Sequence, residues 1–340
     1  MLDDIYPRLL LEIIPDELKL NSLGIQRLVA EHNSGTKFNA VYGQLIKSIY
    51  QAQPDSNIGI QFGKYLLPSN LCDFSRVLIT SQNLKSALEL IQRSYSLHSG
   101  SYYPFISHRK GVVSISLTFP YKSYVPSRQR RFCAESVFSY LINAIRVAIS
   151  TDFQPKKVTF DYKRPNYATE YTPLFGENVC FGRQMCLIEF DEQILYRPLS
   201  TSNPVLHQMY LNKCLDDMRL SERQNDFEYK AITYLLLHHP ESFNSKKLAT
   251  KLNISVRGLQ KKLNKQELSF SYIANLTRRE LAKVYLIQEK QSIDYTAEQL
   301  GFQTDSGFRR FFKTEFDVNP VEYLKQANLS SGNAYSPFQA

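Results

Sequence analysis

Residues 249–263, ATKLNISVRGLQKKL, return in altered form as residues 297–312, AEQLGFQTDSGFRRFF, and this duplication decides the fold of the last hundred residues. An internal repeat predicts two copies of one supersecondary unit. The offset is 48 residues before the turn and 49 after it, so the length difference falls in the turn itself. The matched pairs are Ala249 and Ala297, Leu252 and Leu300, Asn253 and Gly301, Ile254 and Phe302, Gly258 and Gly307, Leu259 and Phe308, and Leu263 and Phe312.

Each copy has the pattern of a helix-turn-helix unit. In the first copy, Asn253 tolerates the left-handed conformation that ends a helix, and Ser255 has the side chain needed to cap the next one. In the second copy, Ser292 starts a helix, Gly301 stops it, and Thr304 or Asp305 caps the helix that follows. Apolar residues at helical spacing give each second helix one buried face, which leaves its polar side available for contacts.

The segment between the two copies, residues 270–290, fits one continuous helix. At ~1.5 Å per residue it spans roughly 31 Å. This length is close to one turn of B-DNA, about 34 Å, which separates two recognition helices that enter successive major grooves. One chain with this spacing is therefore suited to a task for which other helix-turn-helix proteins use two chains.

Positive charge gathers in the first copy. Residues 245–266 contain seven lysines and arginines and no acid, whereas the whole chain of 340 residues has 41 cations against 32 acids. A single charged helix face is most often merely solvated. Together with the repeat and the spacer, however, this run favours a polyanionic partner such as DNA.

The first two hundred residues predict a mixed α and β unit. Helical spacing marks 40–51, 84–95 and 134–149, and alternation marks a strand at 112–119 with one buried face. Residues 108–111 have the composition of a hairpin turn that pairs this strand with 102–107. Short strands are expected at 157–162 and 186–190, and a short helix at 205–218.

Composition excludes several classes of protein. The most apolar window, 136–150, is short and carries Arg146, so we expect no membrane span, and the acidic N-terminus argues against secretion. The five cysteines have no C-x-x-C spacing, which argues against a disulfide framework or a Cys-rich zinc site. We expect a cytoplasmic protein without a cofactor or metal.

Residues 245–324 resemble the double helix-turn-helix domain of the AraC/XylS family of bacterial transcription regulators. The resemblance rests on A-x-x-L-G-F at 297–302, F-x-x-x-F-K-x-x-F at 308–316, N-P-x-x-Y at 319–323 and R-x-x-L-A-x-x-Y-L at 278–286. More weakly, residues 57–204 are similar to the arabinose-binding-like sensor domain of one branch of that family. The motifs that carry this similarity are D-x-x-I-G at 55–59, L-x-x-A-L at 84–88, V-x-F at 158–160, F-G at 175–176 and L-x-x-P-L at 195–199.

The resemblance implies an α+β sensor domain followed by an all-α double helix-turn-helix domain. We assign 1–204 to effector sensing and dimerisation, 205–224 to a linker, 225–328 to DNA binding and 329–340 to a disordered tail. The implied partners are double-stranded DNA, RNA polymerase, a small organic effector and a second copy of the chain. The implied function is regulation of transcription, with activation favoured over repression, in association with the bacterial nucleoid.

Carried over position by position, the family's base contacts fall on the exposed sides of the two recognition helices. Arg can read guanine, Gln adenine and Asp cytosine in the major groove, whereas lysines contact phosphates and set the register. The base-reading residues are Arg257, Gln260, Lys261, Asp305, Ser306, Arg309 and Arg310. The phosphate contacts are Lys246, Lys247, Lys251, Lys262 and Lys313.

For the effector, we expect aromatic groups on the strand pair and nearby arginines that attract an anion. For the aromatic groups ordinary core packing is the more common explanation, and for the arginines a solvated face is. The candidate pocket residues are Tyr102, Tyr103, Phe105, His108, Arg128, Arg130 and Arg131.

Two alternatives remain open. The N-terminal domain could be an enzyme, although none of the nucleotide-binding, metalloprotease or nucleophile-elbow motifs occurs, so we expect no catalytic residue. It could also bind a protein, or DNA-bound copies of itself, without any small ligand.

Overall fold

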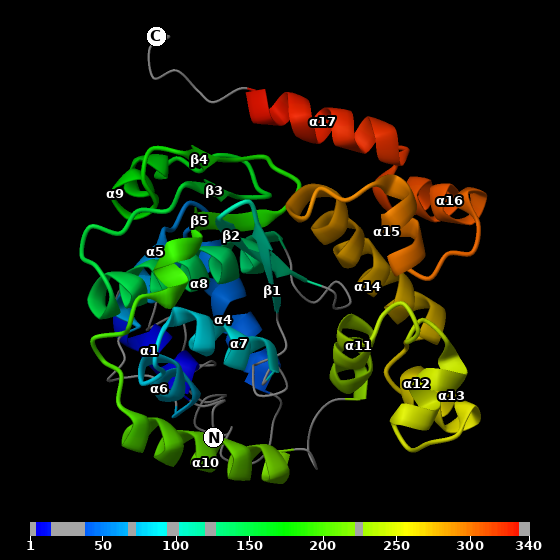
Figure 1. The fold of residues 1–340 in the computed structure, drawn as a ribbon, viewed down its shortest axis with the longest axis horizontal. Helices are drawn as coiled ribbons and strands as arrows, with labels where there is room; N and C mark the ends of the chain where they lie inside the picture. Colours follow the sequence, from blue (N-terminus) through cyan, green and yellow to red (C-terminus); the bar gives the residue numbers. More distant parts are fainter. Residues whose placement is uncertain are drawn as a thin grey trace.

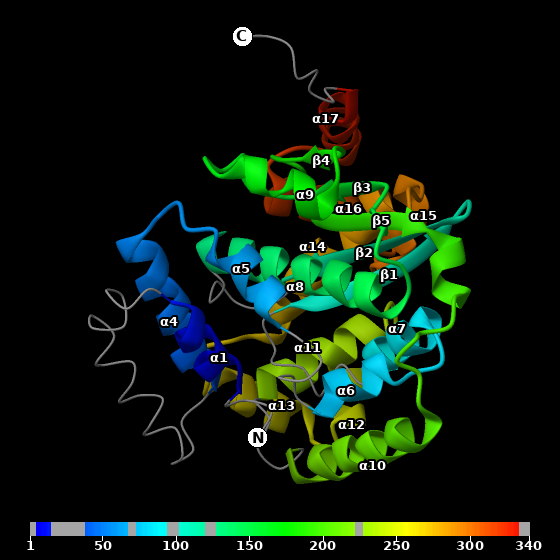
Figure 2. The same ribbon diagram turned by 90° about the vertical axis from the view of Figure 1, so that its left-hand side faces the viewer.

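The structure, a computed structural model, has two parts that lie side by side (Figures 1 and 2). A mixed α/β part runs through helix α10 (Pro204–Ser221), and an all-helical part starts with α11 (Phe227–Leu237). The predicted fold class is therefore confirmed. The structure describes residues 5–14, 38–66, 73–93, 102–119, 127–221 and 227–332.

A five-stranded sheet organises the first part, in the order β1-β2-β5-β3-β4. Its pairs are antiparallel except β3 with β4. The predicted hairpin forms, and its turn consists of Lys110 and Gly111, which both have positive φ angles, 50° and 74°. The strands are β1 (Tyr103–Arg109), β2 (Val112–Thr118), β3 (Lys157–Thr159), β4 (Val179–Cys180) and β5 (Cys186–Asp191).

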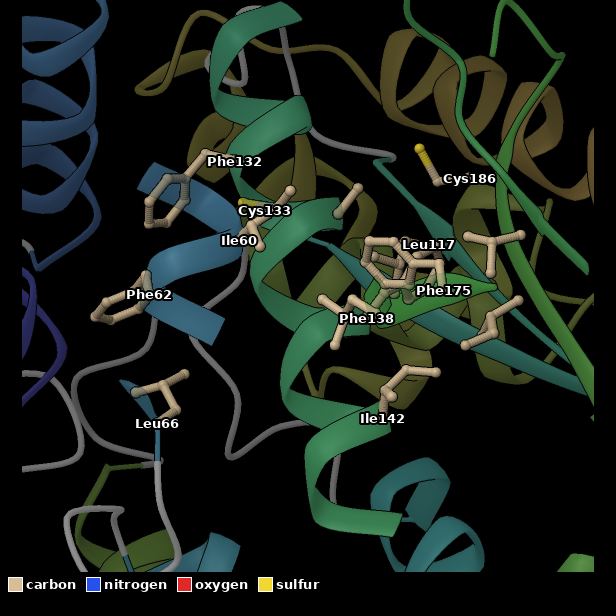
Figure 3. Close-up of a cluster of buried hydrophobic side chains, with 14 of the residues drawn as sticks. Ile60, Phe62, Leu66, Leu117, Phe132, Cys133, Phe138, Ile142, Phe175 and Cys186 are labelled. Carbon is tan, nitrogen blue, oxygen red and sulfur yellow. The ribbon is translucent and has the colours of Figure 1, made fainter. Parts of the chain in front are cut away.

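Helix α8 (Ser127–Ala148) crosses one face of the sheet and carries the core of this part (Figure 3). Phe132, Phe138 and Ile142 on α8 are fully buried. Helix α5 (Ile58–Tyr65) packs closely on α8, and Gly63 allows this because it has no side chain. A Cβ atom at this position would lie only 2.4 Å from the Ser136 carbonyl oxygen.

Smaller helices surround this core. Helix α8 begins seven residues before the predicted start at 134, so the three predicted arginines lie in its first turns. The others are α1 (Ile5–Ile13), α4 (Phe38–Ala52), α6 (Asp73–Ile79), α7 (Leu84–Arg93), η4 (Ala168–Glu170), α9 (Thr172–Phe175) and η5 (Glu192–Tyr196). Within the described ranges, no helix is long and apolar enough to cross a membrane.

The prediction that residues 112–119 bury one face was wrong. Val113, Ile115 and Leu117 are buried as expected, in the same core as α8, but Ser114 and Ser116, on the opposite side of β2, are buried as well. The reason is that the helical part covers this second face of the sheet. Small hydroxyl side chains there meet polar groups rather than water.

The helical part holds both copies of the repeat. The sequence predicted one continuous helix over residues 270–290, and this was wrong. The central α-helix, α14 (Phe270–Lys283), passes instead into one π-helical turn, η6 (Val284–Gln288). Helix α17 ends at Gly332, so residues 329–332, which were assigned to the disordered tail, are helical. Residues 333–340 lie outside the described ranges. The elements are α12 (Ser245–Lys251), α13 (Val256–Asn264), α14 (Phe270–Lys283), η6 (Val284–Gln288), α15 (Ile293–Gln299), α16 (Asp305–Phe316) and α17 (Pro320–Gly332).

Candidate nucleic-acid interface

The two turns of the repeat have the same hydrogen-bond pattern. Asn253 and Gly301 adopt positive φ angles of 53° and 75°. The next residue's amide then donates back across the turn, from Ile254 to the Ala249 carbonyl and from Phe302 to that of Ala297, both at 3.0 Å. These bonds satisfy carbonyls that the helix end leaves unpaired. The two turns, which lie 48 residues apart in the sequence, thus form the same backbone hydrogen bond between corresponding residues.

In the first unit, α13 has one buried side and one open side. Ser255 caps it by accepting a 3.0 Å hydrogen bond from the Gly258 amide, as predicted. Leu259 and Leu263 are fully buried in the domain core. The three predicted base-reading residues, Arg257, Gln260 and Lys261, are all exposed on the other side.

In the second unit, α16 is built in the same way around aromatic rings. The cap is Thr304, whose hydroxyl accepts from the Gly307 amide at 3.2 Å. The predicted base-reading residues Asp305, Ser306, Arg309 and Arg310 are all exposed. Asp305 already has a partner within the protein: its Oδ2 accepts a 2.6 Å hydrogen bond from Arg309 Nε. This contact orients the guanidinium before DNA binds.

The predicted phosphate contacts are exposed too, and two of them have partners within the protein. Lys247 Nζ lies 3.1 Å from Glu241 Oε2, and Lys262 Nζ lies 5.0 Å from the centre of the Phe227 ring. The former contact is a surface ion pair that costs little to open. The exposed lysines are Lys246, Lys247, Lys251, Lys262 and Lys313.

Arg278 joins the two units. Its guanidinium lies 4.4 Å from the Phe243 ring centre and 4.9 Å from that of Phe302, and its Nε donates a 2.9 Å hydrogen bond to the Leu300 carbonyl. Burial lowers the pKa of Arg278 to about 10. From the sequence, Arg278 is known only as part of a family motif. The structure shows that its side chain packs between Phe243 and Phe302 and binds the Leu300 carbonyl.

The candidate effector residues on the strand pair divide between two surroundings. Tyr103 and Phe105, with ring centres 5.1 Å apart, pack into the core of the helical part. Tyr102 instead packs beside the sensor core, and His108 Nδ1 lies 3.5 Å from Glu192 Oε1 near the hairpin turn. Tyr103 and Phe105 therefore connect the two parts of the chain.

The candidate arginines lie on α8, which covers the opposite face of the sheet. Arg128 Nη1 donates a 3.0 Å hydrogen bond to the Tyr50 carbonyl, and Arg130 Nη1 lies 3.8 Å from Asp161 Oδ2. The structure thus does not bring these arginines together with Tyr103 and Phe105 in one pocket.

Arg131 belongs to a buried polar cluster around Glu135. Glu135 Oε1 accepts hydrogen bonds from Arg131 Nε at 3.1 Å, Tyr167 Oη at 2.7 Å and Tyr171 Oη at 2.5 Å. Burial raises the pKa of Glu135, and its Oε2 has no partner among the described residues. The Arg131 guanidinium also lies 4.7 Å from the Tyr167 ring centre and 5.4 Å from that of Tyr50.

Sequence reasoning missed a polar contact between the two parts. Gln288 in η6 is buried and hydrogen-bonded to the β1–β2 hairpin, and Glu280 in α14 accepts a 3.2 Å hydrogen bond from the Phe119 amide. The signal that could have indicated this contact is the row of hydroxyl residues at 114, 116 and 118. The alternating pattern of the strand led us to expect these side chains to face solvent.

Comparison with known proteins supports both parts. Residues 21–199, more than half of the chain, match the arabinose-binding domain of AraC transcription regulators, N-terminal. Residues 248–326 match a helix-turn-helix domain.

Two proteins of Pseudomonas aeruginosa are similar along most of their length. An ornithine utilization regulator is 23% identical over 283 residues, which cover 83% of this chain and 82% of that protein. The crystal structure of the transcriptional regulator CdpR aligns with 92% of this chain and 99% of its own, at 17% identity and a TM-score of 0.45. Given the matched domains and the paired helix-turn-helix geometry, this chain belongs to the AraC family of transcription regulators and joins an arabinose-binding-type sensor domain to a DNA-binding domain.

Proposed function

We propose that the two helix-turn-helix units read adjacent major grooves on one face of a DNA duplex. The observation that carries this proposal is the equivalence of the two units: each has the same turn, the same hydroxyl cap and an exposed polar side on its second helix. Every base-reading and phosphate-contacting residue predicted from the sequence is exposed. The sensor domain therefore covers none of them.

Footprinting tests this proposal after genome-wide mapping has supplied a bound site. The full-length protein should protect two patches about one helical turn apart on one face of the duplex. Arg257→Ala should weaken one patch and Arg309→Ala the other. Gln208→Ala serves as the control, because Gln208 is exposed on α10, outside both helix-turn-helix units. This variant should leave both patches intact. Protection of a single groove by the unaltered protein would refute the proposal.

We further propose that the protein acts in the bacterial cytoplasm on the nucleoid, as an activator that contacts RNA polymerase, and that the sensor domain binds a small organic effector and pairs with a second copy. A relative at 23% identity is named for ornithine utilization, which suggests amino acids as the first effectors to try. The buried Arg131–Glu135 pair supports this choice, since a zwitterion presents one group to each charge. Tyr103 and Phe105 then transmit the signal instead of lining the pocket.

A thermal-shift screen tests the effector. L-Ornithine, L-arginine and a neutral amino acid are compared on the full chain, and a ligand at 100 times its Kd should stabilise the fold by about 2.7 kcal/mol. Glu135→Gln should abolish the shift for a cationic amino acid. If none of the compounds shifts the melting temperature, cationic and neutral amino acids of these kinds are excluded as effectors, and a sensor domain that binds a protein is favoured.

A further inference from the structure

The sheet of the sensor domain offers a polar docking surface to the DNA-binding domain. Ser114, Ser116 and Thr118 alternate along β2 on the side away from α8, and all three are buried. A buried hydroxyl is costly unless it is hydrogen-bonded. Thr118 donates to the Tyr103 carbonyl at 3.0 Å, within the sheet, whereas the two serines also meet a side chain of the other domain.

That side chain is Gln288, whose carboxamide is hydrogen-bonded on both of its ends. Its Oε1 accepts a 2.5 Å hydrogen bond from Ser116 Oγ. Its Nε2 lies 3.0 Å from the Ser114 carbonyl, 3.2 Å from the Phe105 carbonyl and 3.3 Å from Ser114 Oγ. An amide supplies an acceptor and donors at once, which neither a carboxylate nor an apolar side chain does. Gln288 is thus matched to the hairpin by chemistry as well as by shape.

A second contact lies two turns earlier on the central helix. Glu280 Oε2 accepts from the Phe119 amide at 3.2 Å and from Lys283 Nζ at 2.7 Å, and both side chains are largely buried. Between the two contacts, Val284 packs with Met185 and Leu187 of the sensor domain. One continuous face of the central helix is therefore docked on the sheet.

The π-turn brings Gln288 onto this face. In an unbroken α-helix, each residue advances ~100°, so Gln288 would lie about 80° around the axis from Glu280. The wider winding of η6, marked by the 2.9 Å bond from the Glu289 amide to the Val284 carbonyl, reduces this rotation. A π-turn is rare and is often found at functional sites. Here its last residue, Gln288, is the one that is hydrogen-bonded to the sensor hairpin.

We infer that Gln288 is a positioning residue for DNA recognition. The sensor hairpin binds the side-chain amide of Gln288 and so holds the π-turn. The π-turn in turn sets the rotation of the second helix-turn-helix unit relative to the first. This inference rests on the proposed two-groove reading. Helix α15 begins five residues after Gln288, so a change of winding in η6 passes directly to α15 and α16. An effector that alters the β1–β2 hairpin would change the spacing of bases that the protein prefers.

The test is the affinity of the full-length protein for three duplexes: the mapped site, and the same site with one base pair added or removed between the two half-sites. Gln288→Met keeps the side-chain length and removes the hydrogen bonds, and we expect it to reduce the preference for the natural spacing by about tenfold. Gln208→Met is the matched control at an exposed position and should keep the preference. A purely structural loss would weaken all three duplexes equally and leave their ratio unchanged.

Two further measurements keep the inference falsifiable. Ser116→Ala should reduce the spacing preference less than Gln288→Met, because it removes only one of the contacts of Gln288. It should add nothing in the double variant, because Gln288→Met has already removed that contact. If Gln288→Met does not fold, Ser116→Ala alone should still lower the ratio. The Glu289 amide should exchange hydrogen faster in Gln288→Met than in the unaltered protein.

The outcomes separate this inference from the proposed function. If the unaltered protein protects two grooves but Gln288→Met and Ser116→Ala keep its spacing preference, the inference about Gln288 is wrong and two-groove reading stands. If the unaltered protein protects only one groove, both fall.

Discussion

The two helix-turn-helix units share one backbone pattern but differ in what fills them. The first unit is closed by aliphatic side chains, with Leu259 and Leu263 fully buried. The second is closed by aromatic rings: Phe312 lies 4.3 Å from Phe316 and 5.4 Å from Tyr323, measured between ring centres. The same turn geometry thus tolerates two kinds of core, because the glycine or asparagine in the turn and the cap fix the backbone while the interior needs only apolar volume.

The exposed sides differ as well. The first unit lies in a stretch of seven cations without an acid, whereas the second carries Asp305 in contact with Arg309. A uniform positive side suits contact with phosphates, and an oriented arginine suits contact with base edges. We therefore expect the first unit to supply more of the salt-dependent affinity and the second to read sequence with a more rigid side chain.

The largest expected difference is in stability. Phe312→Ala should cost about 3–5 kcal/mol of unfolding free energy, at the upper end of large-to-small core changes, and Leu263→Ala should cost less within about 2–5 kcal/mol. The reason is that Phe312 contacts three other rings. Because the chain has no tryptophan, urea unfolding is followed by circular dichroism. An equal or larger cost for Leu263→Ala would contradict this difference between the cores.

Base reading should be separable in the two units. Arg257→Ala should lose about 1–3 kcal/mol of binding and relax preference at one base position, and Arg309→Ala should do so at a position in the other half-site. Asp305→Ala should loosen preference only in the half-site of Arg309, since it removes the 2.6 Å contact that orients this side chain. Titration of single-base variants of the mapped site measures all three. Equal weakening on every sequence would assign these arginines to phosphate instead.

Phosphate contacts should show in salt dependence rather than in sequence preference. Lys246→Ala should reduce the slope of log affinity against log salt by about 0.9. Lys247→Ala should reduce it by less, because Lys247 must leave Glu241 before it reaches a phosphate. Binding titrations at four salt concentrations compare the two variants. A steeper loss for Lys247→Ala would show that the ion pair does not compete with DNA.

The smallest effect is expected at the two glycines of the recognition helices. Replacing glycine by alanine inside a helix gains at most about 1 kcal/mol. An added Cβ would lie 3.3 Å from Ser255 Oγ at Gly258 but only 3.1 Å from Thr304 Oγ1 at Gly307. Gly258→Ala should therefore stabilise the protein more than Gly307→Ala does, as measured by urea unfolding. The reverse order would mean that the Thr304 cap shifts more easily than the Ser255 cap.

Local features of the DNA-binding domain were largely predictable. Asn253 and Gly301 were expected to end helices and do so with positive φ angles. Ser255 was expected to cap a helix and Ser292 to start one, and both are N-caps in the structure. The choice between Thr304 and Asp305 was left open, and the structure selects Thr304. These features depend on interactions within four residues of chain, which a sequence displays directly.

Long-range polar contacts were not predictable. Alternation along β2 assigned Ser114 and Ser116 to solvent, because the pattern of a strand does not reveal what covers its second face. The π-turn was missed as well, since the apolar spacing of residues 270–290 fits a plain helix and shows neither the turn nor the docking of Gln288 on the hairpin.

By itself, the sequence determined the duplicated helix-turn-helix units, their caps and their exposed charged sides, because each of these follows from local backbone preference and helical periodicity. Only the tertiary structure decided that the sensor sheet is covered on both faces and that Gln288 and Glu280 fasten it to the central helix. Their partners lie more than 150 residues away in the chain, and only the folded molecule places the Gln288 amide and the Glu280 carboxylate against them.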